Sequence, residues 1–340
     1  MIAIHRASDA DAARWDAFVA GQAHATGYHE WAWRGVFARA FRHESIYLMA
    51  LDGERVAGVL PLVQINSLVF GRTLTSLPFV NYGGVLAASP EAARALQEAS
   101  ASCGRERRCR HVELRHVARQ FPELPCKQHK VTMKLALVPD LWNALDGKVR
   151  NQIRKAQKSG LTGERGGVEL LPEFYGVFAR NMRDLGTPVY GEQVFAEVLR
   201  AFPGRAHVHI VRLNGMAVAG ALTFRTGGTT EVPWASSVRD YNSLCPNHLL
   251  YWGIIEAAAA GGGDTLDFGR STPDEGTFKF KQQWGARPVP LHWEYPLVAD
   301  GFVPNASPAN PKYRVAIEVW KKLPLSVATR FGPRIVRSIP

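Results

Sequence analysis

The sequence predicts a mixed α/β (α+β) protein with two domains from an internal duplication, each a mixed sheet flanked by helices. Three observations predict this: a length of 340 residues, a content of 46% apolar and 21% charged residues, and a repeated segment. Such a length corresponds to roughly two domains of 100 to 200 residues. The apolar content is enough for real cores, which excludes intrinsically disordered and collagen-like chains.

The repeat is clearest in a hairpin that occurs twice. Residues 51–62 read LDGERVAGVLPL and residues 213–224 read LNGMAVAGALTF, with six of twelve positions identical at an offset of 162. Each copy follows a strand-like run, and Asp-Gly or Asn-Gly between two such runs is a strong hairpin signal. We therefore expect equivalent hairpin turns at Asp52–Gly53 and Asn214–Gly215.

The order of elements after the hairpin repeats as well. A strand, a helix and a closing strand are expected at 73–80, 90–103 and 111–117, and again at 229–236, 246–260 and 265–271. Agreement in both sequence and order favours duplication over chance. The predicted organisation is a first domain at 1–135, a basic helical connector at 136–170, a second domain at 171–297, and a Pro-rich linker with a basic tail at 298–340.

Charge and cysteine content narrow the class of protein. The chain has 41 Lys and Arg against 30 Asp and Glu, a net charge of +11, which favours an anionic partner such as nucleic acid, a phosphorylated substrate or a membrane surface. Its four scattered cysteines show no metal-ligand spacing, so we expect a reduced protein without a metal site. Apolar runs are too short to span a membrane, and the N-terminus does not resemble a signal peptide. These features predict a cytoplasmic protein, or one at the inner face of the membrane.

Familiar catalytic motifs are absent. The sequence contains no P-loop, no dinucleotide-binding glycine motif after a strand, no HExxH and no GxSxG. Hydride transfer, P-loop hydrolysis and zinc proteolysis are therefore disfavoured.

A helix expected at 148–160 has a basic face. Arg150, Arg154 and Lys158 are spaced i, i+4, i+8, and this segment contains five cations and no acid. Like charges at this spacing repel, so a bound anion would stabilise the helix. We therefore predict an anion site here, with an ordinary solvated face as the alternative.

Polar residues also gather at the closing strand of the second half. Asp267, Arg270 and Ser271 lie in or beside this strand, and in α/β units ligands bind beyond the carboxyl ends of strands. These three residues are candidates for a site.

The next segment, FKFKQQWGA (278–286), alternates in polarity. The alternation predicts a strand with Lys279 and Lys281 on one side and Phe278 and Phe280 on the other. Lysines facing a ligand, or lysines protecting an edge strand from aggregation, both fit this spacing.

The tail, residues 312–340, has seven Lys or Arg and a single acid, Glu318, mixed with apolar residues. This composition suits an anionic membrane surface. Docking on the protein through an apolar face is the favoured alternative, because Pro324 and Pro333 interrupt any long helix.

These motifs resemble known families. The duplicated strand, hairpin, strand, helix, strand unit resembles the acetyltransferase (GNAT) fold in tandem. RNQIRKAQKSGL (150–161), and FKFKQQWGA after DFGRST, resemble the FemAB family of peptidoglycan-type aminoacyl transferases. With TPVYG (187–191) and KKLPLSVATRFGP (321–333), the whole chain is similar to FemAB-related proteins of exosortase/PEP-CTERM exopolysaccharide loci.

The resemblance implies a substrate cleft formed by two GNAT-like domains, an aminoacyl-tRNA donor, and a C-terminal segment that returns to the first domain. The lysine of the family's FK-x-x-aromatic-G pattern falls on Lys281, near the reacting groups. We take Lys281 and Asp267 as catalytic candidates. The substrate-binding candidates are Arg150, Arg154, Lys158, Tyr190, Trp234, Asn247, Arg270, Ser271 and Lys279.

One departure concerns the donor. Acyl-CoA enzymes place Q/R-x-x-G-x-G/A between a strand and a helix, where backbone N–H groups bind the diphosphate. The nearest match, RTGGTT (225–230), is expected in a hairpin turn, whereas the strand-to-helix junction is SVRDYNSLCPNH (237–248). The usual cradle is therefore missing.

Three functions remain. The first is a FemAB-type acyl or aminoacyl transferase acting on a cell-envelope or exopolysaccharide precursor. The second is an acyl-CoA-dependent GNAT N-acyltransferase, and the third a catalytically silent protein that binds an anionic glycan or lipid precursor. The expected partners are an anionic small-molecule, glycan-linked or lipid-linked acceptor, the donor (aminoacyl-tRNA or acyl-CoA), and a membrane contacted peripherally.

Overall fold

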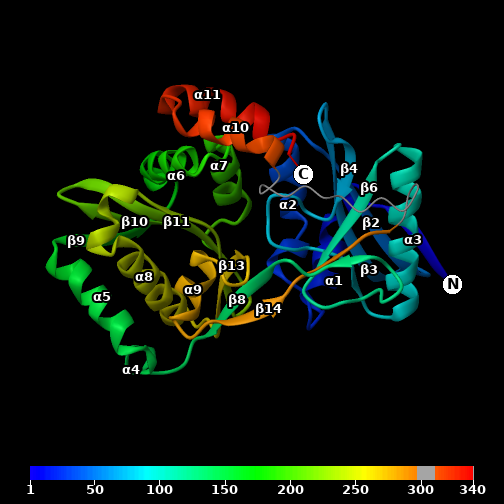
Figure 1. The fold of residues 1–340 in the computed structure, drawn as a ribbon. Coiled ribbons are helices and arrows are strands. Elements are labelled where there is room, and N and C mark those ends of the chain that lie inside the picture. The colour runs from blue at the N-terminus through cyan, green and yellow to red at the C-terminus, as the bar shows by residue number, and fades with distance from the viewer. Residues whose placement is uncertain (297–310, 340) are drawn as a thin grey trace. The chain divides into compact units, whose positions relative to one another are not determined.

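The computed structural model describes residues 1–296 and 311–339, and the chain divides into two compact units (Figure 1). Of the described residues, the first unit contains 1–130, 290–296 and 337–339, and the second contains 131–289 and 311–336. Each unit has its own mixed sheet and its own core.

The first unit is built on a sheet with the strand order β1-β2-β3-β4-β6-β15-β7, and β5 pairs with β3. Its strands are β1 (Ile2–Arg6), β2 (Glu44–Asp52), β3 (Arg55–Ser67), β4 (Gly71–Thr75), β5 (Leu86–Ala87), β6 (His111–His116), β7 (Cys126–Lys127) and β15 (His292–Glu294). Its main helices are α1 (Ala12–Ala20), α2 (Ala32–Val36) and α3 (Pro90–Glu106). The amphipathic α3 contacts β1, β2, β3 and β6, and this contact buries Leu96 completely against Leu60 and Leu114.

A late strand completes this sheet. β15 pairs with β6 and β7, and its Glu294 is fully buried. The Glu294 carboxylate accepts hydrogen bonds from the backbone nitrogens of Gln120 (3.1 Å) and Phe121 (2.7 Å) and lies 2.7 Å from His116 Nδ1. Val85 N donates to His116 Nε2, so Nδ1 carries the ring proton that faces Glu294. Burial alone would raise the pKa of Glu294, but His116 and the two backbone donors together hold it below its usual value.

The second unit has the strand order β14-β8-β13-β12-β11-β10-β9. The strands are β8 (Val131–Ala136), β9 (Leu161–Gly166), β10 (Ala206–Leu213), β11 (Met216–Thr226), β12 (Thr229–Ser237), β13 (Thr265–Ser271) and β14 (Arg287–Pro290). The helices are α4 (Leu141–Ala144), α5 (Gly147–Lys158), α6 (Leu171–Leu185), α7 (Glu192–Ala201), α8 (Pro246–Ala260), α9 (Gly276–Gln282), α10 (Pro311–Lys321) and α11 (Leu325–Val336).

The predicted duplication is confirmed by topology. The expected turns lie between β2 and β3 and between β10 and β11, and Gly53 and Gly215 adopt the positive φ values of +61° and +81° that such tight turns favour. In both units the third strand then pairs in parallel with the strand that follows the helix: β4 with β6, and β12 with β13. Glu113 and Asp267 occupy corresponding positions in these two ladders.

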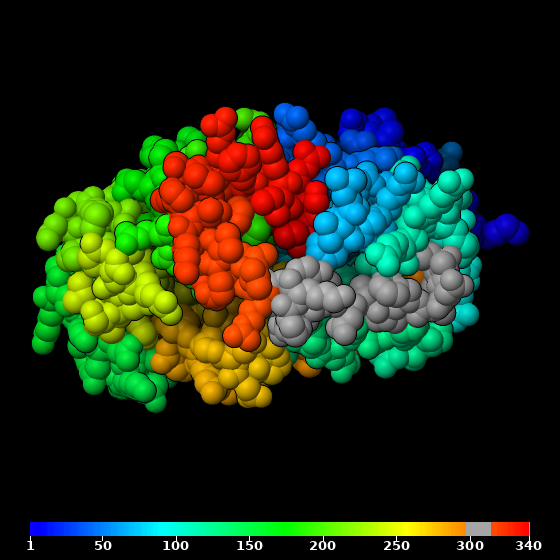
Figure 2. All heavy atoms as spheres, turned by 45° about the horizontal axis from the view of Figure 1, so that its top comes forward, coloured from blue at the N-terminus to red at the C-terminus, as the bar shows by residue number. Residues whose placement is uncertain are grey.

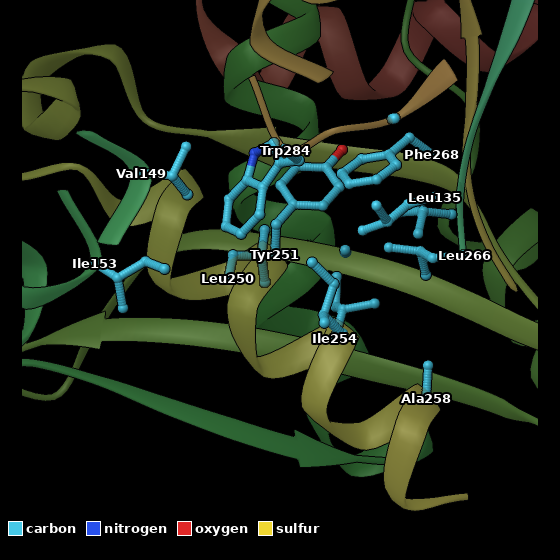
Figure 3. Packing of buried hydrophobic residues seen from close by; sticks show 14 of the residues in the cluster. Leu135, Val149, Ile153, Leu250, Tyr251, Ile254, Ala258, Leu266, Phe268 and Trp284 are labelled. Atoms are coloured by element: carbon cyan, nitrogen blue, oxygen red, sulfur yellow. The ribbon is translucent and has the colours of Figure 1, made fainter. Parts of the chain in front are cut away.

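The core of the second unit lies between the sheet and α5 and α8. Figure 3 shows Tyr251 of α8, Phe268 of β13 and Trp284 gathered in this core, and Tyr251 stacks on Phe268 with ring centroids 5.1 Å apart. Val149 and Ile153 bury the apolar face of α5 against α8 and β9. The basic helix thus packs as part of the second unit.

The tail forms two helices on the second unit. α10 and α11 contact α6, and Figure 2 shows them, orange to red, lying over this unit's green helices. Ala328 is fully buried, Gly332 packs against Val189, and Arg183 Nη1 donates to Leu323 O at 3.0 Å. Only 337–339 of the described tail group with the first unit. The expected linker up to residue 310 lies outside the described residues.

Candidate active site

Two neighbouring strands of the second unit separate along their length. β12 and β13 pair only where Thr229–Glu231 lie beside Thr265–Asp267. Beyond Glu231, no described strand pairs with β12 on this side, although β12 continues to Ser237. On the other side β11 pairs with β12 as far as Ser237, so only the backbone N–H and C=O groups of 232–237 that point away from β11 need another partner, which an extended ligand could supply. This opening lies at the carboxyl ends of the two strands.

A bulge in β12 marks the point of separation. Leu222 of β11 pairs with Trp234 whereas Phe224 pairs with Glu231, so Val232 and Pro233 together face one residue of β11. Such a bulge bends a strand and redirects its side chains, and bulges are common beside active sites.

Two predicted aromatic site residues meet on one side of the opening. The Trp234 ring lies edge-on to Phe195 of α7 with centroids 5.3 Å apart, and the Tyr190 ring contacts the same Phe195 at 6.5 Å. Tyr190 also stacks on Phe178 of α6. Trp234 is nearly buried whereas Tyr190 is half-buried, so this cluster forms an aromatic wall beside the unpaired part of β12.

Asn247 lies on the other side of β12, at the start of α8. Its Nδ2 donates to Ser237 Oγ at 2.9 Å, and Ser237 Oγ donates to Asn242 Oδ1 at 3.1 Å. The junction runs through a short 3₁₀ segment (Arg239–Leu244) to α8, which begins with Pro246. Because proline has no N–H, this helix terminus offers one donor fewer to a diphosphate. RTGGTT is in the β11–β12 turn, as the sequence predicts.

The strand predicted at 278–286 is wrong, because residues 276–282 form the helix α9. The apolar residues at 280 and 284 are four positions apart. Residues at this spacing share a face both in a strand and in a helix, so the spacing does not distinguish the two structures. Phe280 and Trp284 pack against His248 and Tyr251 of α8, which a helix achieves. Lys279 and Lys281 do not share a face: Lys279 is exposed, and Lys281 is only 7% exposed.

Lys281 donates hydrogen bonds to two backbone oxygens of β13. Its Nζ lies 2.9 Å from Gly269 O and 3.0 Å from Arg270 O. An ammonium group has three N–H donors, so one remains for another acceptor. Burial lowers the pKa of Lys281 to about 8, although the nearby carboxylate of Asp267 opposes this change. The group is therefore largely protonated at neutral pH, yet close to the range in which a proton can be exchanged.

A second bulge lies in β13, where the register with β8 shifts between Asp267 and Arg270, and Asp267 supports this bulge. It is fully buried, and its Oδ1 accepts from Thr132 Oγ1 at 2.5 Å and from Gly269 N at 2.7 Å. Gly269 has a φ of +76°, which allows the bulge to form. Asp267 thus positions the carbonyls that hold Lys281. Ser271 follows at the end of β13, where its buried Oγ has no hydrogen-bond partner among the described residues.

One residue in this neighbourhood was not predicted from the sequence. Gln283 Nε2 lies 3.3 Å from His248 Nε2, and an amide N–H can only donate, so His248 carries its proton on Nδ1. That nitrogen is buried and has no partner in the described structure, and the same holds for Trp284 Nε1, whose ring lies beside the imidazole. Burial lowers the pKa of His248 to about 4, so the ring is neutral. The only sequence signal was its place at the start of a helix.

The basic face of α5 forms as predicted. Arg154 lies over the ring of Trp142 at 5.2 Å, and Lys158 is exposed. Arg150 is half-buried, and its Nε has no hydrogen-bond partner among the described residues. These cations therefore remain candidates for binding an anion.

Two surface pockets of the second unit lie elsewhere. Their volumes are about 350 and about 280 Å³, and they share Arg165 and His209. The larger is lined by Thr230, near the paired start of β12, and by Gly261 after the end of α8. No predicted site residue lines either pocket, so we place the candidate site at the strand opening.

Comparison with known protein families identifies one domain. Residues 147–282, which lie within the second unit, match the acetyltransferase (GNAT) domain family. No curated protein matches the sequence.

Solved structures show the same architecture over most of the chain. FemX matches with a TM-score of 0.66 and 14% identity, over 93% of this chain and 100% of FemX. The C-terminal domain of a protein described as a lysylphosphatidylglycerol synthetase from Agrobacterium fabrum matches with a TM-score of 0.59 and 12% identity, over 86% and 93%. A tandem GNAT protein from the clavulanic acid biosynthesis pathway matches with a TM-score of 0.56 and 11% identity, over 88% and 100%. The chain therefore has a tandem GNAT-like fold, and the domain match in its second unit indicates a transferase.

Proposed function

We propose that this protein transfers an acyl group, and in first place an aminoacyl group, to an amine or hydroxyl of a cell-envelope or exopolysaccharide precursor. The acyl end of the donor would lie in the opening between β12 and β13. The observation that carries this proposal is the unpaired edge of β12 at 232–237, which faces the bulge of β13 where the buried Lys281 is held.

The chemistry needs orientation and charge stabilisation. The acceptor nitrogen or oxygen attacks the donor carbonyl, the new N–C or O–C bond forms, and the bond from the carbonyl carbon to the donor oxygen or sulfur breaks. The acceptor loses one proton, and the departing oxygen or sulfur gains one. An activated ester and a positioned nucleophile already favour this exchange. The remaining N–H of Lys281 would stabilise the negative oxygen of the tetrahedral intermediate.

Different observations support the two donors. The likeness to FemX and to a protein described as a lysylphosphatidylglycerol synthetase, together with the Pro246 start of α8, favours an aminoacyl ester. The match to the acetyltransferase (GNAT) domain family, and the likeness to a tandem GNAT protein from the clavulanic acid biosynthesis pathway, favour acyl-CoA as the second candidate. In either case Arg150, Arg154 and Lys158 would bind the phosphate of the acceptor or donor.

Two assays separate these functions. Purified protein is titrated calorimetrically with acetyl-CoA, and is separately incubated with tRNA charged with labelled amino acids plus a cell-envelope extract of the source organism. We expect label to move from tRNA to the extract without acetyl-CoA binding. Acetyl-CoA binding, with acetyl transfer to the extract and none from tRNA, would establish the second candidate. Binding of an anionic glycan or lipid precursor with no transfer from either donor would identify a catalytically silent binding protein and overturn both.

A further inference from the structure

The turn between β3 and β4 exposes apolar side chains. Leu68 is 108% and Val69 71% exposed, and Phe70 is half-buried. The turn is nonetheless ordered, because Ser67 Oγ accepts hydrogen bonds from the backbone nitrogens of Val69 (3.3 Å) and Phe70 (3.1 Å). It forms a projecting tip beside the β4 label in Figure 1. This tip, residues 67–71, presents the adjacent apolar side chains of Leu68 and Val69, which no other described residue of the first unit covers.

The duplication supplies an internal comparison. The corresponding turn of the second unit, between β11 and β12, consists of Gly227 and Gly228 between two threonines. That turn joins the equivalent strands without any apolar residue. The fold therefore does not require the apolar tip of the first unit, and its apolar side chains need another explanation.

Exposed arginines lie near the base of the tip. Arg72, Arg108 and Arg110 are all exposed. Arg110 N donates to Arg72 O at 2.8 Å, and Arg110 Nη1 reaches Phe70 O at 3.5 Å, so two of these side chains start directly below the turn. An apolar tip next to exposed arginines matches the order of layers in an anionic membrane, in which hydrocarbon lies beyond phosphate.

We infer that residues 67–71 insert into an anionic lipid bilayer, with Leu68 and Val69 in the hydrocarbon boundary and Arg72, Arg108 and Arg110 on lipid phosphates. A protein partner fits less well, because a stable interface needs about 800 Å² from each side and a tip of five residues offers far less. The inference does not rest on the proposed reaction, because it concerns the first unit alone.

Vesicle flotation tests the inference with the full-length chain. We expect binding to vesicles of phosphatidylcholine and phosphatidylglycerol that falls with added salt, and no binding to phosphatidylcholine alone. The double change Leu68→Ser and Val69→Ser should weaken binding by about tenfold or more, since it removes the inserted apolar surface. Met216→Ser, which removes a 49% exposed apolar side chain at the β10–β11 turn, is the matched control and should leave binding unchanged.

Three results would overturn the inference. The first is that the wild-type chain fails to float with anionic vesicles. The second is that the double variant floats as well as the wild type, which would mean that another surface, such as the basic tail, binds lipid. The third is a concentration-dependent dimer, seen by light scattering without lipid, that the double variant abolishes. Equal melting temperatures of the variants would establish that lost binding does not reflect unfolding.

Discussion

Replacing Lys281 by Met is the sharpest test of the candidate site. Methionine keeps much of the aliphatic bulk and removes the charge and all three donors, so it separates electrostatics from packing. Lys322→Met is the control, because Lys322 is an exposed lysine of the second unit that is not among the candidate site residues.

The pKa of Lys281 predicts how stability depends on pH. Burial lowers it from 10.5 to about 8. One pKa unit is about 1.36 kcal/mol, so keeping Lys281 protonated costs the folded state roughly 3 kcal/mol at neutral pH. Between pH 8 and 10.5 the unfolded chain holds this proton and the folded chain does not, so the free energy of unfolding rises with pH in this window. A methionine at this position removes that rise.

At pH 7 two effects of Lys281→Met oppose each other. Removing the buried charge relieves roughly 3 kcal/mol. Leaving Gly269 O and Arg270 O without their donor costs about 1 to 3 kcal/mol each. The net change in the free energy of unfolding then lies between a gain of about 1 kcal/mol and a loss of about 3 kcal/mol, which shifts the melting temperature by roughly 10 °C at most.

Turnover should fall sharply while the protein stays folded. Loss of an oxyanion donor typically lowers kcat by about 10² to 10³, and we expect this for Lys281→Met in the transfer assay, with Lys322→Met near wild type. Urea unfolding from pH 7 to 10.5 measures the stability term. A large loss of stability with normal specific activity in the folded fraction would show that Lys281 is structural. A difference between wild type and Lys281→Met that is flat with pH would refute the lowered pKa.

Other perturbations test the remaining parts of the structure. Changing Arg150, Arg154 and Lys158 together to Gln should weaken binding of charged tRNA or acceptor and reduce its salt dependence without unfolding the protein; unchanged affinity across a salt titration would leave only a solvated face. Glu294→Ala should lower the free energy of unfolding in urea by about 3 to 5 kcal/mol, because it removes the partner of a buried histidine and of two backbone N–H groups; a loss below about 1 kcal/mol would contradict the buried network. His248→Phe keeps the aromatic packing and removes an unpaired donor, so we expect about a tenfold loss of turnover at unchanged stability, and full activity would exclude His248 from the site.

The sequence predicts the fold well because the determining signals are local. The two Asx-Gly turns, and the helix at 246–260 followed by the strand at 265–271, lie where the periodicity places them. The strand expected at 73–80 is shorter, since β4 ends at Thr75 and both Leu77 and Phe79 have positive φ. No propensity rule favours a left-handed conformation for leucine or phenylalanine, so tertiary contacts determine this turn.

The site is less predictable because its features depend on pairing between distant segments. The sequence pattern at 278–286 fits a strand and a helix equally well. The contacts of Phe280 and Trp284 with α8 decide between them, and these contacts exist only in the folded unit. The hydrogen bonds of Lys281 to β13, and the unpaired Nδ1 of His248, exist only in the assembled unit. A sequence reveals which residues can titrate, but not which of them are buried without partners.

The asymmetry between the duplicated units explains why the chemistry is assigned to the second. In the first unit β4 ends at Thr75, and Ser76 turns back onto β6: its N donates to Glu113 O at 2.9 Å, and its Oγ accepts from Arg115 N at 2.8 Å. The loop after β4 thus occupies the edge of β6. In the second unit the corresponding edge of β13 stays open. The two acids at matching positions differ accordingly, since Glu113 is neutralised by Arg115 and accepts from Tyr295 OH, whereas Asp267 supports the bulge that holds a buried lysine. Among the described residues, the duplicated fold closes this opening in the first unit and keeps it in the second, and this is why we propose that an extended acyl donor pairs with β12 of the second unit.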